Sequence, residues 1–81
     1  MNYNKHDLSS VDISKEQLNQ IIENYIIGFK AERNRLIMKR RLLDGITFED
    51  LSYEFDLSVN QIKNIVYNQL EIIIKHIEIR A

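Results

Sequence analysis

The sequence predicts an all-α protein of about four helices, and three observations support this fold class. The chain of 81 residues contains no proline and only two glycines, so it has little of the turn chemistry that β-hairpins need. Apolar residues recur at spacings of three and four along much of its length, which is the period of an amphipathic helix. Residues that favour helix caps precede these periodic segments.

The composition predicts one small domain. The apolar fraction of 44% and the charged fraction of 28% are ordinary for a soluble globular protein. There is no cysteine, and no apolar run reaches the roughly 18–20 residues that a membrane span needs. The polar N-terminus does not have the apolar core of a signal peptide. We therefore expect a cytoplasmic protein with no membrane segment, in which residues 1–13 form a flexible tail and residues 14–81 a single helical domain.

The first helix is predicted at residues 15–29. Ser14 and Gln17 have the Ser-x-x-Gln spacing of a capping box, in which each side chain bonds the backbone N–H of the other residue. A single apolar stripe then follows at helical spacing, made of Leu18, Ile21, Ile22, Tyr25, Ile26 and Phe29.

A second helix is predicted at residues 31–43. It is either separate from the first or continuous with it, because Gly28 costs about 1 kcal/mol inside a helix, which is too little to force a break. The segment ends at Asp44-Gly45, since glycine readily takes the left-handed conformation that closes a helix.

Two further caps predict the remaining helices. Thr47 begins a helix at residues 48–55, whose first turn holds two acids where the helix dipole favours them. Ser58 begins a final helix at residues 59–78. The inward face of this final helix is expected to be Ile62, Ile65, Val66, Gln69, Ile73 and Ile77.

Residues 46–70 have the pattern of a helix-turn-helix, in which two helices cross through a turn of three or four residues. A small residue, Ser52, stands where the helices touch. Asp56 replaces the usual glycine of the turn, and aspartate tolerates the left-handed conformation better than most residues. Apolar residues occupy the positions that hold the two helices together, namely Leu51, Phe55, Leu57, Ile62 and Ile65.

This segment resembles the C-terminal, promoter-reading domain of bacterial sigma factors. Residues 41–51 are similar to the approach to its helix-turn-helix, and residues 58–64 to the start of the recognition helix that LuxR-type regulators share. Arg40 departs from the pattern, because the family usually has an apolar residue there. The resemblance covers residues 35–76 and none of the other sigma-factor regions, so the chain looks more like the small stand-alone regulators of phages and mobile elements. It implies base or phosphate contacts at Ser58, Asn60, Gln61, Lys63 and Asn64.

The charge pattern supports a nucleic-acid partner. The net charge of −1 hides a segment with a net charge of +5 at residues 30–41, followed by one of −5 at residues 42–56. Arg33, Arg40 and Arg41 of the basic segment are predicted to contact phosphate, which supplies most of the affinity of DNA-binding proteins. The alternative is that the basic segment is simply a solvated helix face. The acidic segment is expected to face away from DNA, where it could meet a basic surface of RNA polymerase.

Two functions therefore stand as expectations. The first is a sequence-specific transcriptional regulator that binds double-stranded DNA. The second is a protein-interaction module that binds RNA polymerase or another regulator without reading DNA. No nucleophile motif, phosphate loop or acid–base pair is evident, and the two histidines have no ligand partners at metal spacing. We therefore expect no enzymatic activity, no cofactor and no metal.

The C-terminal helix also predicts a homodimer. Beyond residue 70 its apolar arc spans more than half of the helix circumference, too much for a helix with one wet face. Ile72, Ile74 and Ile79 are the residues that a monomer is least able to hide. Either a second subunit or the helix at residues 15–29 should cover them.

Overall fold

The computed structural model describes residues 13–80, and the side chains of residues 13–77. This part of the chain contains four α-helices and no strand, which confirms the all-α prediction. The helices are α1 (Lys15–Tyr25), α2 (Ala31–Leu42), α3 (Phe48–Phe55) and α4 (Val59–Arg80). The predicted tail lies outside the described residues except for Ile13, which packs against the core. No helix among the described residues is long and apolar enough to cross a membrane.

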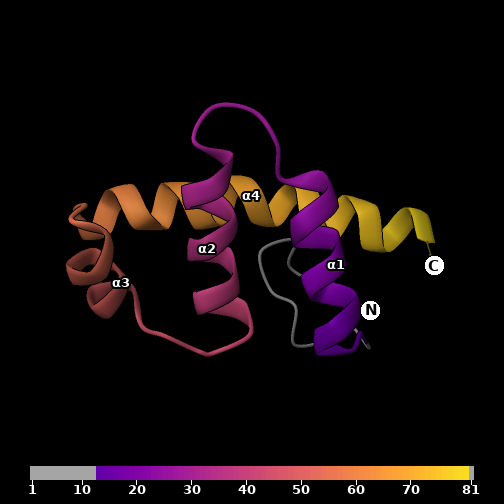
Figure 1. Cartoon of the computed structure of the whole chain (residues 1–81), viewed down its shortest axis with the longest axis horizontal. Coiled ribbons are helices and arrows are strands. Elements are labelled where there is room, and N and C mark those ends of the chain that lie inside the picture. The colour runs from indigo at the N-terminus through magenta and orange to yellow at the C-terminus, as the bar shows by residue number, and fades with distance from the viewer. Residues whose placement is uncertain (1–12, 81) are drawn as a thin grey trace, which may run out of the picture.

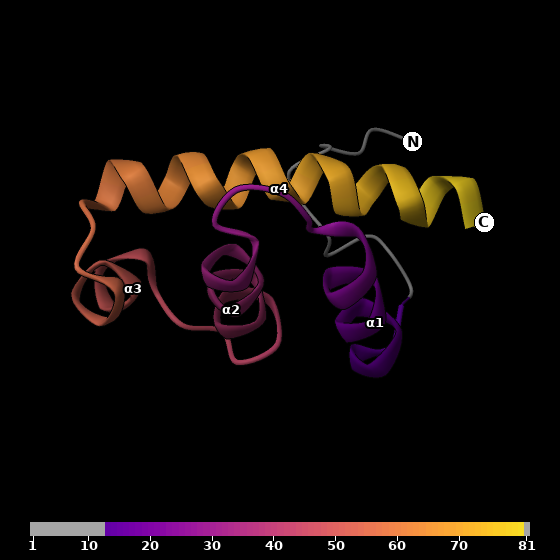
Figure 2. The same cartoon turned by 45° about the horizontal axis from the view of Figure 1, so that its top comes forward.

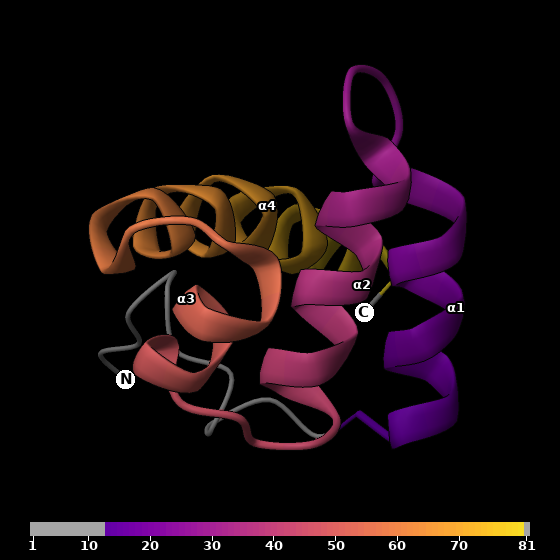
Figure 3. The same cartoon turned by 60° about the vertical axis from the view of Figure 1, so that its left-hand side comes forward.

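The long helix α4 organises the fold. The three shorter helices lie side by side across it in the order α3, α2 and α1, from the beginning of α4 toward its end (Figures 1 and 2). Helices α1 and α2 run antiparallel, and a projecting loop joins them at the top of Figure 3. Because α2 lies between α1 and α3, it contacts both neighbours as well as α4. One side of α4 is therefore covered by the other helices.

A single core joins the four helices. Its buried apolar residues come from every helix and from the residue after α1: Leu18, Ile21, Ile22, Ile26, Ile37, Met38, Leu51, Ile62, Val66, Leu70, Ile73 and Ile74. Ile74 is one of the three residues on which the dimer prediction rests. It is only 3% exposed, because it is part of this core. Ile72 is half-buried, and the side chain of Ile79 lies outside the described residues. Ile74 is thus covered by its own chain, and it does not need a second subunit to bury it.

The break between α1 and α2 comes earlier than predicted. Helix α1 ends at Tyr25 and not at residue 29, because Ile26 is already extended, with φ −90° and ψ 99°. Gly28 (φ 98°) and Lys30 (φ 59°) then take left-handed conformations that a helix cannot contain. Ile26 remains buried in the loop, whereas Phe29 is 88% exposed. The first two predicted helices are therefore separate.

Candidate nucleic-acid interface

The connection between α3 and α4 is a tight turn closed by hydrogen bonds. Helix α3 begins after Thr47, whose side chain accepts a hydrogen bond from the Asp50 N–H, and ends at Asp56. Asp56 is left-handed, with φ 55° and ψ 46°, as its place in the predicted turn requires. The Ser52 hydroxyl donates to the Leu57 carbonyl, and the Leu57 N–H donates to the Ser52 carbonyl over 3.1 Å. Ser52 therefore ties α3 to the turn from both its side chain and its backbone.

Apolar contacts fix α3 against the first half of α4. Leu51 and Ile62 are fully buried. The other predicted packing residues of this pair are half-buried against the same core, namely Phe55, Leu57 and Ile65. Since the inner side of α4 is held in this way, the direction of its outer side relative to α3 is fixed as well.

A second capping box begins α4. The Gln61 N–H donates to the Ser58 hydroxyl over 3.1 Å, and the Ser58 N–H donates to the Gln61 side-chain oxygen over 2.9 Å. Both residues hold the start of the helix in the structure, and their contact with DNA stays a prediction. The signal was present in the sequence, because Ser58 and Gln61 repeat the Ser-x-x-Gln spacing of Ser14 and Gln17.

The outer side of α4 carries a row of exposed asparagines. Asn60, Asn64 and Asn68 are all exposed and follow one another at a spacing of four residues, so they lie along one stripe of the helix. No carboxylate occurs between positions 59 and 70. The first two asparagines were predicted as site residues, whereas Asn68 was missed although the same spacing points to it.

These asparagines have no evident structural role. None of the three makes a side-chain hydrogen bond to any described residue. Asparagine is also a poor choice for an exposed helix position, where it is less favourable than alanine by up to about 0.7 kcal/mol. Their amides are therefore available to a partner outside the chain.

Two cations approach the Phe48 ring of α3, one from α2 and one from α4. The Arg41 guanidinium carbon lies 4.1 Å from the centre of the Phe48 ring, and the Lys63 Nζ lies 5.8 Å from it. The rings of Tyr67 and Phe48 form a T-shaped pair, with the ring centres 6.1 Å apart. Arg41 also donates from Nη1 to the Ile46 carbonyl over 3.0 Å. The fold thus brings two of the predicted site residues together from α2 and α4.

Arg40 has a different environment. Its Nε and Nη2 atoms donate to the Glu54 carboxylate over 3.0 and 2.9 Å, and Nη1 donates to Asp44 over 3.2 Å. The hydrogen bond to Glu54, more than any other contact, raises the pKa of the Arg40 guanidinium. This bridge links α2 to α3 at the position where the sigma-factor pattern has an apolar residue. A phosphate contact at Arg40 would compete with two carboxylates.

Other cations of the basic segment are also engaged within the chain. Arg33 donates from Nε and Nη2 to the side-chain oxygen of Asn34, which is buried, over 3.2 and 3.1 Å. Arg35 donates to the Ile26 carbonyl over 2.6 Å, and Lys39 forms an ion pair with Glu23. Phosphate contacts at Arg33 and Arg40 remain predictions, but each would require the side chain to leave an internal partner.

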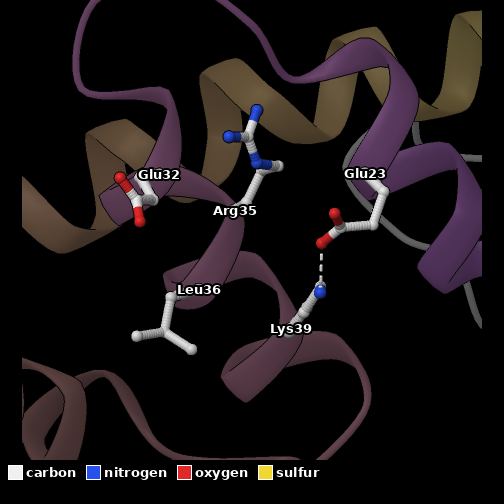
Figure 4. A pocket seen from close by; sticks show the side chains of 5 residues that line it. All are labelled: Glu23, Glu32, Arg35, Leu36 and Lys39. Carbon is white, nitrogen blue, oxygen red and sulfur yellow. Dashed lines mark ion pairs between the residues drawn. The ribbon is translucent and has the colours of Figure 1, made fainter.

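A shallow groove between α1 and α2 lies away from the outer side of α4. It has a volume of about 420 Å³ and is lined by Glu23, Glu32, Arg35, Leu36 and Lys39. Figure 4 shows Lys39 directed at Glu23 across the groove, with α4 behind the two helices. Hydrogen bonding from Lys39 lowers the pKa of the Glu23 carboxyl. Because the charges in this groove are of both signs and partly paired, it does not extend the positive charge of the candidate interface.

No protein-family model matches the chain, and neither a curated protein nor a solved structure matches it. The resemblance to sigma factors and LuxR-type regulators therefore depends on the residues of the sequence alone. The case for a nucleic-acid interface depends on the geometry of α3, α4 and the residues beside them.

Proposed function

We propose that this protein is a transcriptional regulator that binds double-stranded DNA, with the outer side of α4 in the major groove. One observation carries the proposal: the first three turns of α4 present no carboxylate and a row of amides that bond no described residue. Side-chain amides can make paired hydrogen bonds to base edges in the major groove. Helix α3 and the turn at Asp56 support it further, since they hold α4 as a helix-turn-helix holds its recognition helix.

Arg41 and Lys63 are the cations best placed to contact phosphate. Both lie against Phe48 at the start of α3, and Lys63 lies on the same two turns of α4 as Asn60 and Asn64. Neither forms an ion pair with a described carboxylate. With so few available cations, we expect the affinity for random DNA to be low and its dependence on salt to be shallow, because each phosphate contact contributes about one unit to the slope of log K against log salt concentration.

Fluorescence anisotropy of a labelled duplex, titrated with the full chain at several salt concentrations, tests the proposal. We expect binding that weakens as salt rises, and a slope that falls by about one unit in Lys63→Ala. Lys15→Ala is the matched control, since Lys15 is an exposed lysine at the start of α1, a helix that does not contact α3. Absence of binding at low salt, or equal effects of the two substitutions, would contradict the proposal.

A protein-interaction module is the second candidate function, and the exposed side of α3 favours it. Tyr53 is 89% exposed, and tyrosine is enriched at protein–protein interfaces. Glu49, Asp50 and Asp56 around it are exposed and form no ion pair with a described residue. Such a face suits a basic protein surface. If the chain binds no duplex at low salt but is retained by immobilised RNA polymerase, and Tyr53→Ala abolishes that retention, this second function replaces the first.

A further inference from the structure

We propose that Asn60, Asn64 and Asn68 read adenines on successive base pairs, so that the target of this protein is an A·T-containing duplex. The inference rests on the proposed function and goes beyond it by naming the base and the spacing. It starts from the position of the three side chains, all exposed on the side of α4 opposite the buried Ile62 and Val66.

The spacing of the row matches the spacing of bases. Four residues of α-helix rise about 6 Å along the helix axis, and successive base pairs of a duplex are separated by about 3.4 Å. Because the groove runs obliquely to the duplex axis, a step of about 6 Å along a helix in the groove advances by about one base pair, and residues three or four apart on such a helix meet successive bases. Glu71 is the first carboxylate of α4 and follows Asn68 on the exposed side, so the run of α4 without negative side chains ends there.

The chemistry of the row selects adenine. An asparagine amide offers one donor and one acceptor side by side, which matches the N7 acceptor and N6 donor of adenine in the major groove. To read a base in this way, the amide must also have no hydrogen bond to another described residue. Gln61 carries the same group, but its side-chain oxygen already accepts from the Ser58 N–H over 2.9 Å. Gln61 is therefore excluded from the reading set, although it is exposed and adjacent to Asn60.

Selection of bound duplexes from a random pool, followed by sequencing, tests this inference with the full chain. We expect adenines enriched at three successive positions. Asn64→Ala and Asn68→Ala should each remove the preference at one position and lower affinity for the selected duplex about tenfold, with little change on random DNA. Asn24→Ala is the matched control, since it removes an exposed asparagine from α1.

The outcomes separate this inference from the proposed function. Binding without any enriched bases, or enrichment that is unchanged in Asn68→Ala, overturns the adenine-reading row and leaves the DNA-binding function standing. Loss of the preference in Gln61→Ala without loss of helix content also overturns it, because Gln61 then reads a base. Absence of duplex binding by the wild-type chain overturns the function and the inference together.

Discussion

The basic segment at residues 30–41 and the first three turns of α4 were both predicted to contact DNA, but the fold uses them differently. In the basic segment, Arg35, Lys39 and Arg40 bond groups on neighbouring parts of the chain. On the outer side of α4, the asparagine amides bond no described residue. The region with the higher charge holds the helices together, whereas the nearly neutral region is left free.

The comparison shows that charge counted along a sequence is not charge available at a surface. Arg40 brings one positive charge to the basic segment, but Glu54 and Asp44 surround its guanidinium. The carboxylates that make residues 42–56 acidic are thus partly the partners of the cations that make residues 30–41 basic. Arg41 differs from Arg40, because it contacts an aromatic ring and a carbonyl and forms no ion pair with a described carboxylate.

Among the substitutions that test this comparison, the largest change in the free energy of unfolding is expected at Arg35. Arg35→Ala removes the hydrogen bond to the Ile26 carbonyl, which closes the loop between α1 and α2, and should lower the free energy of unfolding by about 1–2 kcal/mol. Urea denaturation followed by circular dichroism measures this. Arg35→Lys keeps the charge and a donor and should lose less. If Arg35→Ala unfolds like the wild type, Arg35 is only a solvated charge.

On the outer side of α4, we expect a smaller change in the free energy of unfolding, and one of opposite sign. Asn64→Ala should raise the free energy of unfolding by about 0.5 kcal/mol, because alanine is the better helix former and no bond to a described residue is lost. Gln61→Ala, one turn earlier, should instead lower it, since the capping box is broken. Thermal denaturation of both variants in parallel gives the signs. A destabilised Asn64→Ala protein would show that this amide has a structural partner.

The smallest effect concerns the Lys39–Glu23 pair and appears only with pH. The pKa of Glu23 is lowered from its ordinary value of 4.5 by Lys39, so the pair stabilises the fold above that value and its contribution is lost as the pH falls through the lowered pKa. Glu23→Gln should therefore be slightly less stable than the wild type at pH 7 and equal to it in acid. Glu32→Gln, across the same groove, is the control. A difference that persists in acid contradicts this account.

Local signals made the helices predictable. The starts of α1, α3 and α4 follow Ser14, Thr47 and Ser58, whose caps lie within three residues of the groups that they bond. The end of α1 was predicted wrongly because Ile26 is buried whether it lies in a helix or in a loop, so its place in the apolar stripe does not reveal the backbone.

The candidate interface was less predictable because its decisive contacts are distant in sequence. Arg40 and Glu54 are 14 residues apart, and Arg35 and Ile26 are nine residues apart, so no local pattern pairs them. The approach of Arg41 and Lys63 to Phe48 likewise depends on how three helices pack. By contrast, Asn60, Asn64 and Asn68 lie on one helix, where a spacing of four is visible in the sequence itself.

The position of α4 also affects how the protein unfolds locally. Helices α1 and α3 make no contact with each other, so each is joined to the rest through α2 and its own half of α4. Local unfolding follows such divisions, because units that share few contacts separate at lower free energy than the whole domain. Detachment of α1 would expose the second half of α4 and leave α2, α3 and the asparagine row assembled. The part of the chain that is proposed to bind DNA can thus stay ordered while α1 detaches.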